Sequence, residues 1–187
     1  VDSLPAPFQT EARLTFNDEF FYVSFVCYDD DTPDLINSLR RDFDYLLNDH
    51  VTIYFGPFND GLNGFYFSLT PAGVQREGIL AGGGSGGESA FNSVWDSKWY
   101  SKVVRYPDRW IVEAAIPWKS FRYKDGLREW NILLDRTDKK RNVISSWIRT
   151  PIQFRTGMFA FAGKLIFDDP VPPASANTKI PARSRAS

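Results

Sequence analysis

The aspartates between positions 29 and 49 are the densest group of potential ligands in the sequence. Asp29, Asp30 and Asp31 are consecutive, and Asp49 closes the segment. Carboxylate oxygens are the ligands that calcium prefers in proteins. The spacing fits no EF-hand, because Gly and Glu are absent from the required offsets. Two interpretations stay open at this point: a calcium site, or carboxylates that are simply solvated in a loop.

A second group of residues could bind sugars through flat aromatic rings. Trp95 and Trp99 follow a glycine-rich segment, and Trp147 and Phe154 lie near the end of a later apolar run. Aromatic rings stack on the apolar faces of pyranoses, and polar neighbours then fix the hydroxyls. The alternative is that the tryptophans fill a core: Trp99, Trp110, Trp118, Trp130 and Trp147. Trp95 fits that alternative least, because it borders the glycine-rich segment.

Several charged residues are embedded between apolar runs, namely Arg41, Asp42, Asp96, Glu113 and Arg136. Such charges either line a polar pocket or pair with one another and fix loops onto the body of the fold. We favour pairing.

Catalysis finds little support in the sequence. His50 is the single histidine, and no P-loop or His-Glu-x-x-His motif occurs; the Gly-x-Ser-x-Gly and Gly-x-Gly-x-x-Gly patterns are matched only inside the glycine run 82–87. The net charge of −1 provides no long-range field for nucleic acid. Apolar runs reach about eight residues, against the roughly 20 that a spanning helix needs. The one cysteine, Cys27, excludes an internal disulfide. We therefore interpret the chain as a binding protein and not an enzyme.

Short aromatic and β-branched runs separated by turn signals predict an all-β fold. Alternation in 20–28 places Phe21, Val23, Phe25 and Cys27 on one face. We predict a two-sheet antiparallel β-sandwich, jelly-roll-like, with Val23, Phe25, Ile53, Phe67, Val112 and Ile132 in its core. The expected strands are 8–16, 20–28, 50–55, 64–69, 74–80, 98–106, 109–116, 130–136, 143–149 and 161–167, with hairpins at 64–80 and 98–116.

Helical signals are few. Asp31-Thr32-Pro33 predicts a cap for a short helix over 34–41, and 118–121 predicts a single turn. The run 82–87 predicts a flexible glycine loop. From Pro170 onward little can be buried, so we expect one domain over 1–169 and a disordered tail over 170–187. No signal peptide opens the chain, and we expect that any export signal has been removed.

A series of phrases in fixed order resembles a known family. The most specific is Trp110-Ile111-Val112-Glu113-Ala114-Ala115-Ile116-Pro117-Trp118. The others are Phe20-Phe21-Tyr22-Val23 with Asp29, Arg41-Asp42, Asp49-His50-Val51-Thr52-Ile53, Gly64-Phe65-Tyr66-Phe67 with Gly73, Trp95-Asp96 with Trp99, Trp130-Asn131-Ile132, Arg136 and Trp147. Over about residues 10–167 the chain resembles the family 9 carbohydrate-binding modules, and within them the branch at the front of large bacterial envelope proteins with a C-terminal region of unknown function.

The resemblance implies a β-sandwich of two antiparallel sheets, often with bound calcium, and so raises calcium at Asp29, Asp30, Asp31 and Asp49. Members that hold sugar ends do so between two tryptophans, helped by a glutamate, an arginine and an asparagine. Here the first tryptophan position falls on 45–48, which begins with Tyr45. The glutamate position is Thr52, and the arginine position is near Ser68. The second tryptophan position holds Phe154 and Arg155. The family's opening strand has no counterpart, which suggests a truncated or processed fragment.

Two functional hypotheses follow. The first is a non-catalytic carbohydrate-binding module of a bacterial extracytoplasmic protein, periplasmic, outer-membrane associated or secreted, with a site built from Trp95, Trp99, Trp147 and Phe154. The second is a structural sandwich that has lost sugar binding and docks onto a partner protein of the envelope, which the absent tryptophan clamp favours. In that case the open sheet edge would receive a partner strand.

Overall fold

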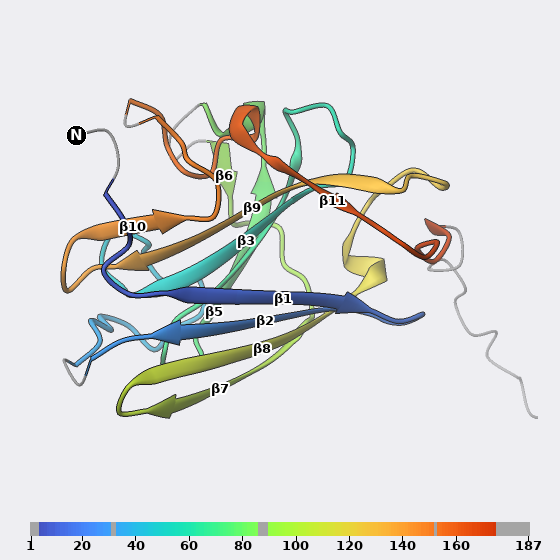
Figure 1. Ribbon diagram of the computed structural model, residues 1–187. Coiled ribbons are helices and arrows are strands. Elements are labelled where there is room, and N and C mark those ends of the chain that lie inside the picture. The colour runs from blue at the N-terminus through green and yellow to red at the C-terminus, as the bar shows by residue number, and fades with distance from the viewer. Residues whose placement is uncertain (1–3, 31–32, 86–89, 152, 175–187) are drawn as a thin grey trace, which may run out of the picture.

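The computed structural model describes residues 4–30, 33–85, 90–151 and 153–174. Its eleven described strands form two antiparallel sheets that pack face to face (Figure 1). Sheet A has the order β1-β2-β8-β7, and sheet B has the order β10-β9-β3-β4-β5-β6, with β11 also paired to β9. The bounds are β1 Thr10–Phe16, β2 Phe20–Tyr28, β3 His50–Gly56, β4 Gly64–Leu69, β5 Gln75–Leu80, β6 Phe91–Asn92, β7 Tyr100–Tyr106, β8 Arg109–Pro117, β9 Glu129–Asp138, β10 Val143–Ser146 and β11 Gly163–Ile166. The predicted β-sandwich is confirmed.

Sheet A shows the alternation that the sequence predicted. Along β2 every second side chain is buried, and Phe25 lies opposite Val112 of β8 in the same inward row. On the facing sheet, Ile53 of β3 lies between Phe67 of β4 and Leu134 of β9. These inward rows form the main core, and the six core residues predicted above are all buried.

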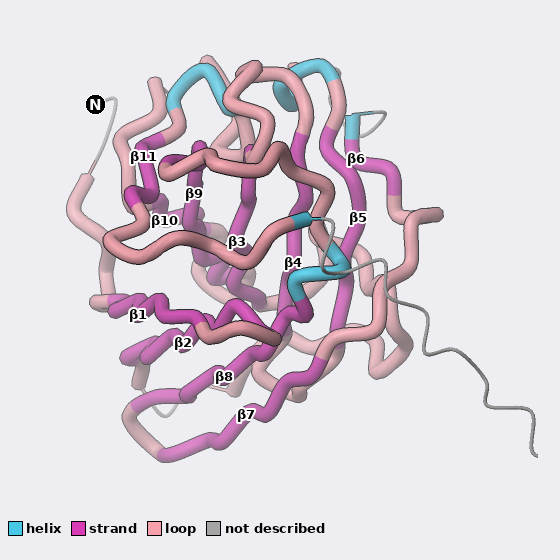
Figure 2. The backbone as a smooth tube through the Cα atoms, turned by 90° about the vertical axis from the view of Figure 1, so that its right-hand side faces the viewer, coloured by secondary structure: helices cyan, strands magenta, loops and turns pink. Residues whose placement is uncertain are grey.

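Sheet B is covered on both of its faces, so β3 and β4 are buried along their whole lengths. A second apolar cluster on its outer face is made by Tyr54, Tyr66, Leu80, Ala90, Leu133 and Phe159. Phe159 lies directly on Gly64, where an added Cβ would come within 2.4 Å of its ring. Figure 2 shows the loops that pack over this side of the molecule. The two sheets therefore differ: one outer face is covered, and the other is open.

Three 3-10 turns are the helical elements among the described residues: η1 Gly82–Gly84, η3 Trp118–Ser120 and η4 Phe159–Phe161. The single turn at 118 is confirmed. The predicted helix over 34–41 is wrong, because side chains of the following segment bind its backbone donors. Asp49 Oδ2 accepts from the Leu35 amide at 2.6 Å, and Asn48 Oδ1 accepts from the Asn37 amide at 2.7 Å.

The predicted flexible loop and tail are each partly attached to the sandwich. Gly83 has φ +65° and lies close enough to Gly61 that an added Cβ would come within 2.7 Å of the Gly61 carbonyl oxygen. Residues 82–84 are thus packed, and 86–87 lie outside the described residues. At the other end, Tyr123 donates to the Pro172 carbonyl at 2.6 Å, and Val171 packs against the core. The rest of the tail, 175–187, lies outside the described residues.

Candidate functional site

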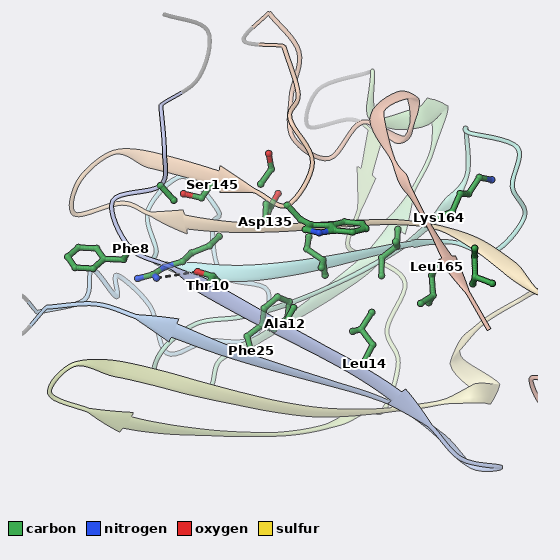
Figure 3. Close-up of a pocket in the computed structure, with 16 residues that line it drawn as sticks. Phe8, Thr10, Ala12, Leu14, Phe25, Asp135, Ser145, Lys164 and Leu165 are labelled. Atoms are coloured by element: carbon green, nitrogen blue, oxygen red, sulfur yellow. Dashed lines mark hydrogen bonds between the residues drawn. The ribbon is translucent and has the colours of Figure 1, made fainter. Parts of the chain in front are cut away.

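A groove of about 530 Å³ opens along one side of the sandwich, between the edge of sheet A and the edge of sheet B (Figure 3). Strand β1 forms one wall, and β9, β10 and β11 form the other. Its lining is mostly apolar with a few polar groups, the usual make-up of a ligand-binding cleft. The lining residues are Ala6, Phe8, Thr10, Ala12, Leu14, Phe25, Ile132, Leu134, Asp135, Arg136, Ser145, Ser146, Trp147, Lys164, Leu165 and Ile166.

The groove exists because β1 ends sheet A among the described strands. Ala12 lies opposite Phe25 in an inward-facing row, yet Ala12 is exposed. Its small side chain leaves the space above the core unfilled, so that Phe25 and Ile132 form an apolar floor. A ligand in this groove therefore contacts the main core directly.

Trp147 is the large exposed aromatic side chain of the groove. It follows β10, and its backbone amide donates to the Leu134 carbonyl at 2.9 Å. Its indole lies against Gly163 of β11, where an added Cβ would come within 2.6 Å of the ring. The side chain is nonetheless 59% exposed. The Trp147 ring thus packs against Gly163 while much of the indole stays open to solvent.

The polar groups of the groove differ in how firmly they are held. Arg136 is buried, donates to the Tyr28 carbonyl at 2.6 Å and pairs with Asp29 at 2.7 Å, so it is fixed in place. Lys164 is half exposed on β11 and pairs with Glu129 at 3.1 Å. Ser145, on β10, lies opposite Arg136. Lys164 Nζ also donates to Asn59 at 3.3 Å, so Ser145 and Lys164 offer a ligand a hydroxyl and an already paired ammonium.

The structure separates the predicted aromatic site into unrelated parts. Trp99 is buried, packs on Phe67, and donates its indole N–H to Glu77 at 3.0 Å. Trp95 is half buried and packs on Phe65 with ring centroids 5.1 Å apart. Both tryptophans pack against the inward row of β4, and neither lines the groove. The structure therefore does not bring Trp95 or Trp99 together with Trp147.

Phe154 is exposed but does not line the groove. It packs on Phe161 of η4 with ring centroids 5.0 Å apart. Of the four predicted sugar-binding residues, the structure therefore brings only Trp147 to the groove.

The four predicted calcium ligands do not form a ligand set in the described part of the chain. Asp29 receives hydrogen bonds from Arg136, Lys140 and Arg141. Asp30 pairs with Arg141 at 2.6 Å. This much positive charge disfavours a bound cation.

Both carboxylate oxygens of Asp49 already accept hydrogen bonds, from the backbone amides of Leu35 and Lys139. Asp31 lies outside the described residues. Within the described ranges, no three His, Cys, Asp or Glu side chains gather as a metal site. The described aspartates are therefore neither grouped as calcium ligands nor simply solvated, because cationic side chains and backbone amides bind them.

The positions of the missing sugar clamp do meet in space, on the outer face of sheet B. Tyr45 and Ser68 share a short hydroxyl–hydroxyl hydrogen bond, and Ser68 contacts Thr52 Oγ1 at 2.9 Å. The Arg76 guanidinium lies 4.3 Å from the centre of the Tyr45 ring. Short hydroxyl side chains thus satisfy one another where the family carries long ligand-binding groups.

Two buried titratable groups lie on this same covered face. Asp135 Oδ2 accepts from Tyr54 at 3.1 Å and from Thr156 at 2.9 Å, and burial raises the pKa of its carboxyl to about 6. His50 donates Nδ1–H to the Asn48 carbonyl at 2.9 Å, and burial lowers the pKa of its imidazole to about 4. Hydroxyls of Tyr54, Thr156 and Thr52 surround the Asp135 carboxyl, and burial outweighs their hydrogen bonds, so the environment favours the protonated form at mildly acidic pH.

Glu77 is a buried charge that the sequence analysis did not single out, as are Asp135 and Asp138. It is 1% exposed and accepts from Trp99, Arg41 and the Ser97 amide. Arg41 also reaches Asp96 at 3.2 Å, as pairing of the embedded charges predicts. Among the groove residues, Ala12, Leu14, Ser145 and Lys164 were also missed. Alternation along β1 indicates that Ala12 and Leu14 face inward, but sequence alone does not reveal which strand edge stays open.

No helix in the described part of the chain has the length and apolar character needed to cross a membrane. No protein-family model and no curated protein matches the sequence.

Solved structures do match the fold. A carbohydrate-binding module of family 9 from Caldicellulosiruptor kristjanssonii, in complex with cellotriose, aligns with a TM-score of 0.59 at 14% identity, over 96% of this chain and 83% of that chain. A complex of such a module with glucose aligns with a TM-score of 0.61 at 14% identity, over 89% and 80%. A candidate carbohydrate-binding protein from Bacteroides uniformis aligns with a TM-score of 0.66 at 15% identity, over 88% and 80%. The chain therefore shares the fold of these modules.

Proposed function

We propose that this domain is a non-catalytic carbohydrate-binding module that holds a sugar in the groove against Trp147. The exposed indole of Trp147 at the groove carries the proposal. One face of a pyranose carries mainly C–H groups, and a flat ring covers such a face well. Contact with Gly163 holds the indole at the groove while leaving much of it open to a ligand.

The groove supplies the remaining features that a sugar needs. Its polar lining groups include Ser145 and Lys164, which can accept and donate hydrogen bonds to hydroxyls. Its volume lies within the roughly 300–1,000 Å³ range of small-ligand sites. The fold likeness to modules solved with glucose and cellotriose supports the same ligand class.

The test compares two exposed aromatic residues. Trp147→Ala should weaken binding of glucose or cellotriose at least about tenfold, the equivalent of one contact of about 1.4 kcal/mol. Its melting temperature should change little, because the ring is largely exposed. Phe154→Ala is the matched control, since Phe154 is similarly exposed but outside the groove. Equal affinity for wild type and Trp147→Ala in calorimetry or affinity electrophoresis would refute the groove as a sugar site.

A second candidate function is supported by the free edge of β1. Backbone groups on this edge have no partner strand among the described residues, and exposed Ala12 lies beside the apolar groove. An extended polypeptide with alternating apolar side chains would pair with β1 and fill the groove. In that case a synthetic peptide of alternating valine and threonine should protect β1 amides from hydrogen exchange, whereas glucose should not.

We also propose an extracytoplasmic bacterial setting for the parent protein, on the resemblance to envelope modules alone. Fractionation of the native host with an antibody against this domain tests it, and recovery in the cytoplasmic fraction would contradict it.

A further inference from the structure

A hollow of about 600 Å³ lies on the outer face of sheet A, and Leu14 is the one lining residue that it shares with the groove. This face is open because no described segment crosses it (Figure 1). The residues around the hollow come from all four strands: Arg13, Leu14 and Thr15 from β1, Tyr22, Val23 and Ser24 from β2, Tyr100, Ser101 and Lys102 from β7, and Glu113, Ala114 and Ala115 from β8.

The strand register places these side chains in two neighbouring rows. In the first row, Ala115 lies between Tyr22 and Tyr100. The small alanine leaves a depression between the two phenol rings. The backbones of Tyr22 and Tyr100 are two inter-strand spacings apart, which is about 10 Å. Alternate rings of an extended pyranose chain are separated by a similar length.

A third ring bridges the two tyrosines. The Phe20 ring centroid is 5.9 Å from that of Tyr22 and 6.0 Å from that of Tyr100. Tyr100 is 51% exposed although it contacts this cluster. Three rings gathered on an uncovered sheet face form a stacking surface of the kind that marks an interaction site.

The second row supplies hydrogen-bonding groups of alternating charge. Glu113 lies between Ser24 and Lys102, and Ser24 lies opposite Arg13. A ligand hydroxyl can donate a hydrogen bond to the Glu113 carboxylate and accept one from Arg13 or Lys102. An anionic ligand would meet Glu113, and a cationic ligand would meet Arg13 and Lys102. This charge pattern favours a neutral, hydroxyl-rich ligand.

We propose that the outer face of sheet A binds a linear neutral pyranose polysaccharide that crosses β2, β8 and β7 with its rings on Tyr22 and Tyr100. The inference takes its ligand class from the proposed function but uses another surface. An open sheet face accepts internal segments of a long chain, whereas the narrow groove suits a short sugar. The two surfaces together would make the domain bivalent toward long glycans.

The experiment uses variants of both surfaces on soluble linear polysaccharides: hydroxyethyl cellulose, xylan, mannan and mixed-linkage β-glucan. Affinity electrophoresis should show that Tyr22→Ala and Tyr100→Ala each weaken binding to at least one polymer about tenfold. Tyr100→Phe should keep binding, because it keeps the ring. Tyr106→Ala is the matched control: Tyr106 is similarly exposed on the same strand, about 20 Å from Tyr100.

The same measurements in the Trp147→Ala background separate the two surfaces. Polymer binding that survives Trp147→Ala and is lost on adding Tyr100→Ala supports the sheet A face. Wild-type affinity in the Tyr22→Ala/Tyr100→Ala double variant overturns the sheet A proposal and leaves the groove intact. Loss of all polymer binding through Trp147→Ala alone likewise overturns the sheet A proposal. Absence of binding to every polymer also overturns it, and the glucose and cellotriose measurements then decide the groove separately.

Discussion

Asp135 and His50 lie on the covered outer face of sheet B, and burial shifts their pKa values in opposite directions. The pKa of the Asp135 carboxyl rises from 3.8 to about 6, and that of the His50 imidazole falls from 6.5 to about 4. Each group therefore binds protons differently in the folded and unfolded chains, and the two differences occur over nearly the same pH range. The free energy of unfolding must depend on pH through both.

The signs of the two contributions are opposite. Between pH 3.8 and about 6, folded Asp135 holds a proton that the unfolded chain lacks, so its contribution to stability falls as pH rises. Between about pH 4 and 6.5, the unfolded chain holds a proton on His50 that the folded chain lacks, so stability rises with pH. Each slope is about 1.4 kcal/mol per pH unit. From about pH 4 to 6 they nearly cancel.

Asp135→Asn should remove one of these contributions and expose the other. Relative to wild type, the variant should gain about 3 kcal/mol between pH 4 and pH 7, the product of the pKa rise and about 1.4 kcal/mol per unit. Asparagine keeps an acceptor for Tyr54 and Thr156, so the hydrogen bonds survive the change. His50→Gln should give a pH dependence of the opposite sign and similar size.

Urea unfolding followed by tryptophan fluorescence at pH 4, 5, 6 and 7 measures these differences. The difference between variant and wild type cancels the other carboxylates, including Asp49 and Glu77, whose pKa values burial also raises. Asp18→Asn controls for the loss of one exposed carboxylate. A stability difference for Asp135→Asn that stays constant across this range would show that Asp135 is not buried among hydroxyls, and the covered face would then be wrong.

Two further predictions concern the packed glycine turn and the acidic segment. Gly83→Ala should lower the free energy of unfolding by more than Gly61→Ala does. Both glycines have a positive φ, but only at Gly83 would the added Cβ come within 2.7 Å of a carbonyl oxygen. Equal melting temperatures for the two variants would contradict the packing of η1. EDTA should leave the melting temperature unchanged, because cationic side chains already neutralise Asp29. A fall in melting temperature that added calcium reverses would support the calcium prediction, with Asp31 as the first ligand to examine.

Local patterns predicted most of the fold. Alternation located β2 with its observed bounds, and the turn at 107–108 located the β7–β8 hairpin. The prediction of a helix over 34–41 was wrong because side-chain acceptors from elsewhere in the folded chain bind backbone amides of this segment. Asn48 Oδ1, from a following segment, accepts from the Asn37 and Ser38 amides, which in that helix would donate to backbone carbonyls one turn earlier. A propensity argument cannot include acceptors that only the folded chain provides.

The candidate site was harder to predict from the sequence than the fold, because it depends on which strand edges of the two sheets lie next to each other. Trp147 was selected as an aromatic residue near a strand end, and the structure places it at a groove. Some of its neighbours there come from β1, far away in the sequence, and others from β11. Conversely, Trp99 has the same residue type and a similar position beside a strand, yet Glu77 binds its indole inside the sandwich. Residue type alone does not distinguish a platform from a core side chain.

The lengths of the connections explain why the two outer faces differ. The hairpins of sheet A turn within residues 17–19 and 107–108, which is too little chain to cover a sheet. The longer segments 29–49, 81–90 and 147–162 adjoin strands of sheet B, and Tyr45, Ala90 and Phe159 from these segments pack on its outer face. The positions that correspond to the family's sugar clamp are thereby enclosed, with Tyr45, Ser68 and Thr52 bonded to one another. The two surfaces for which binding is proposed, the groove beside β1 and the outer face of sheet A, are ones that these loops leave open.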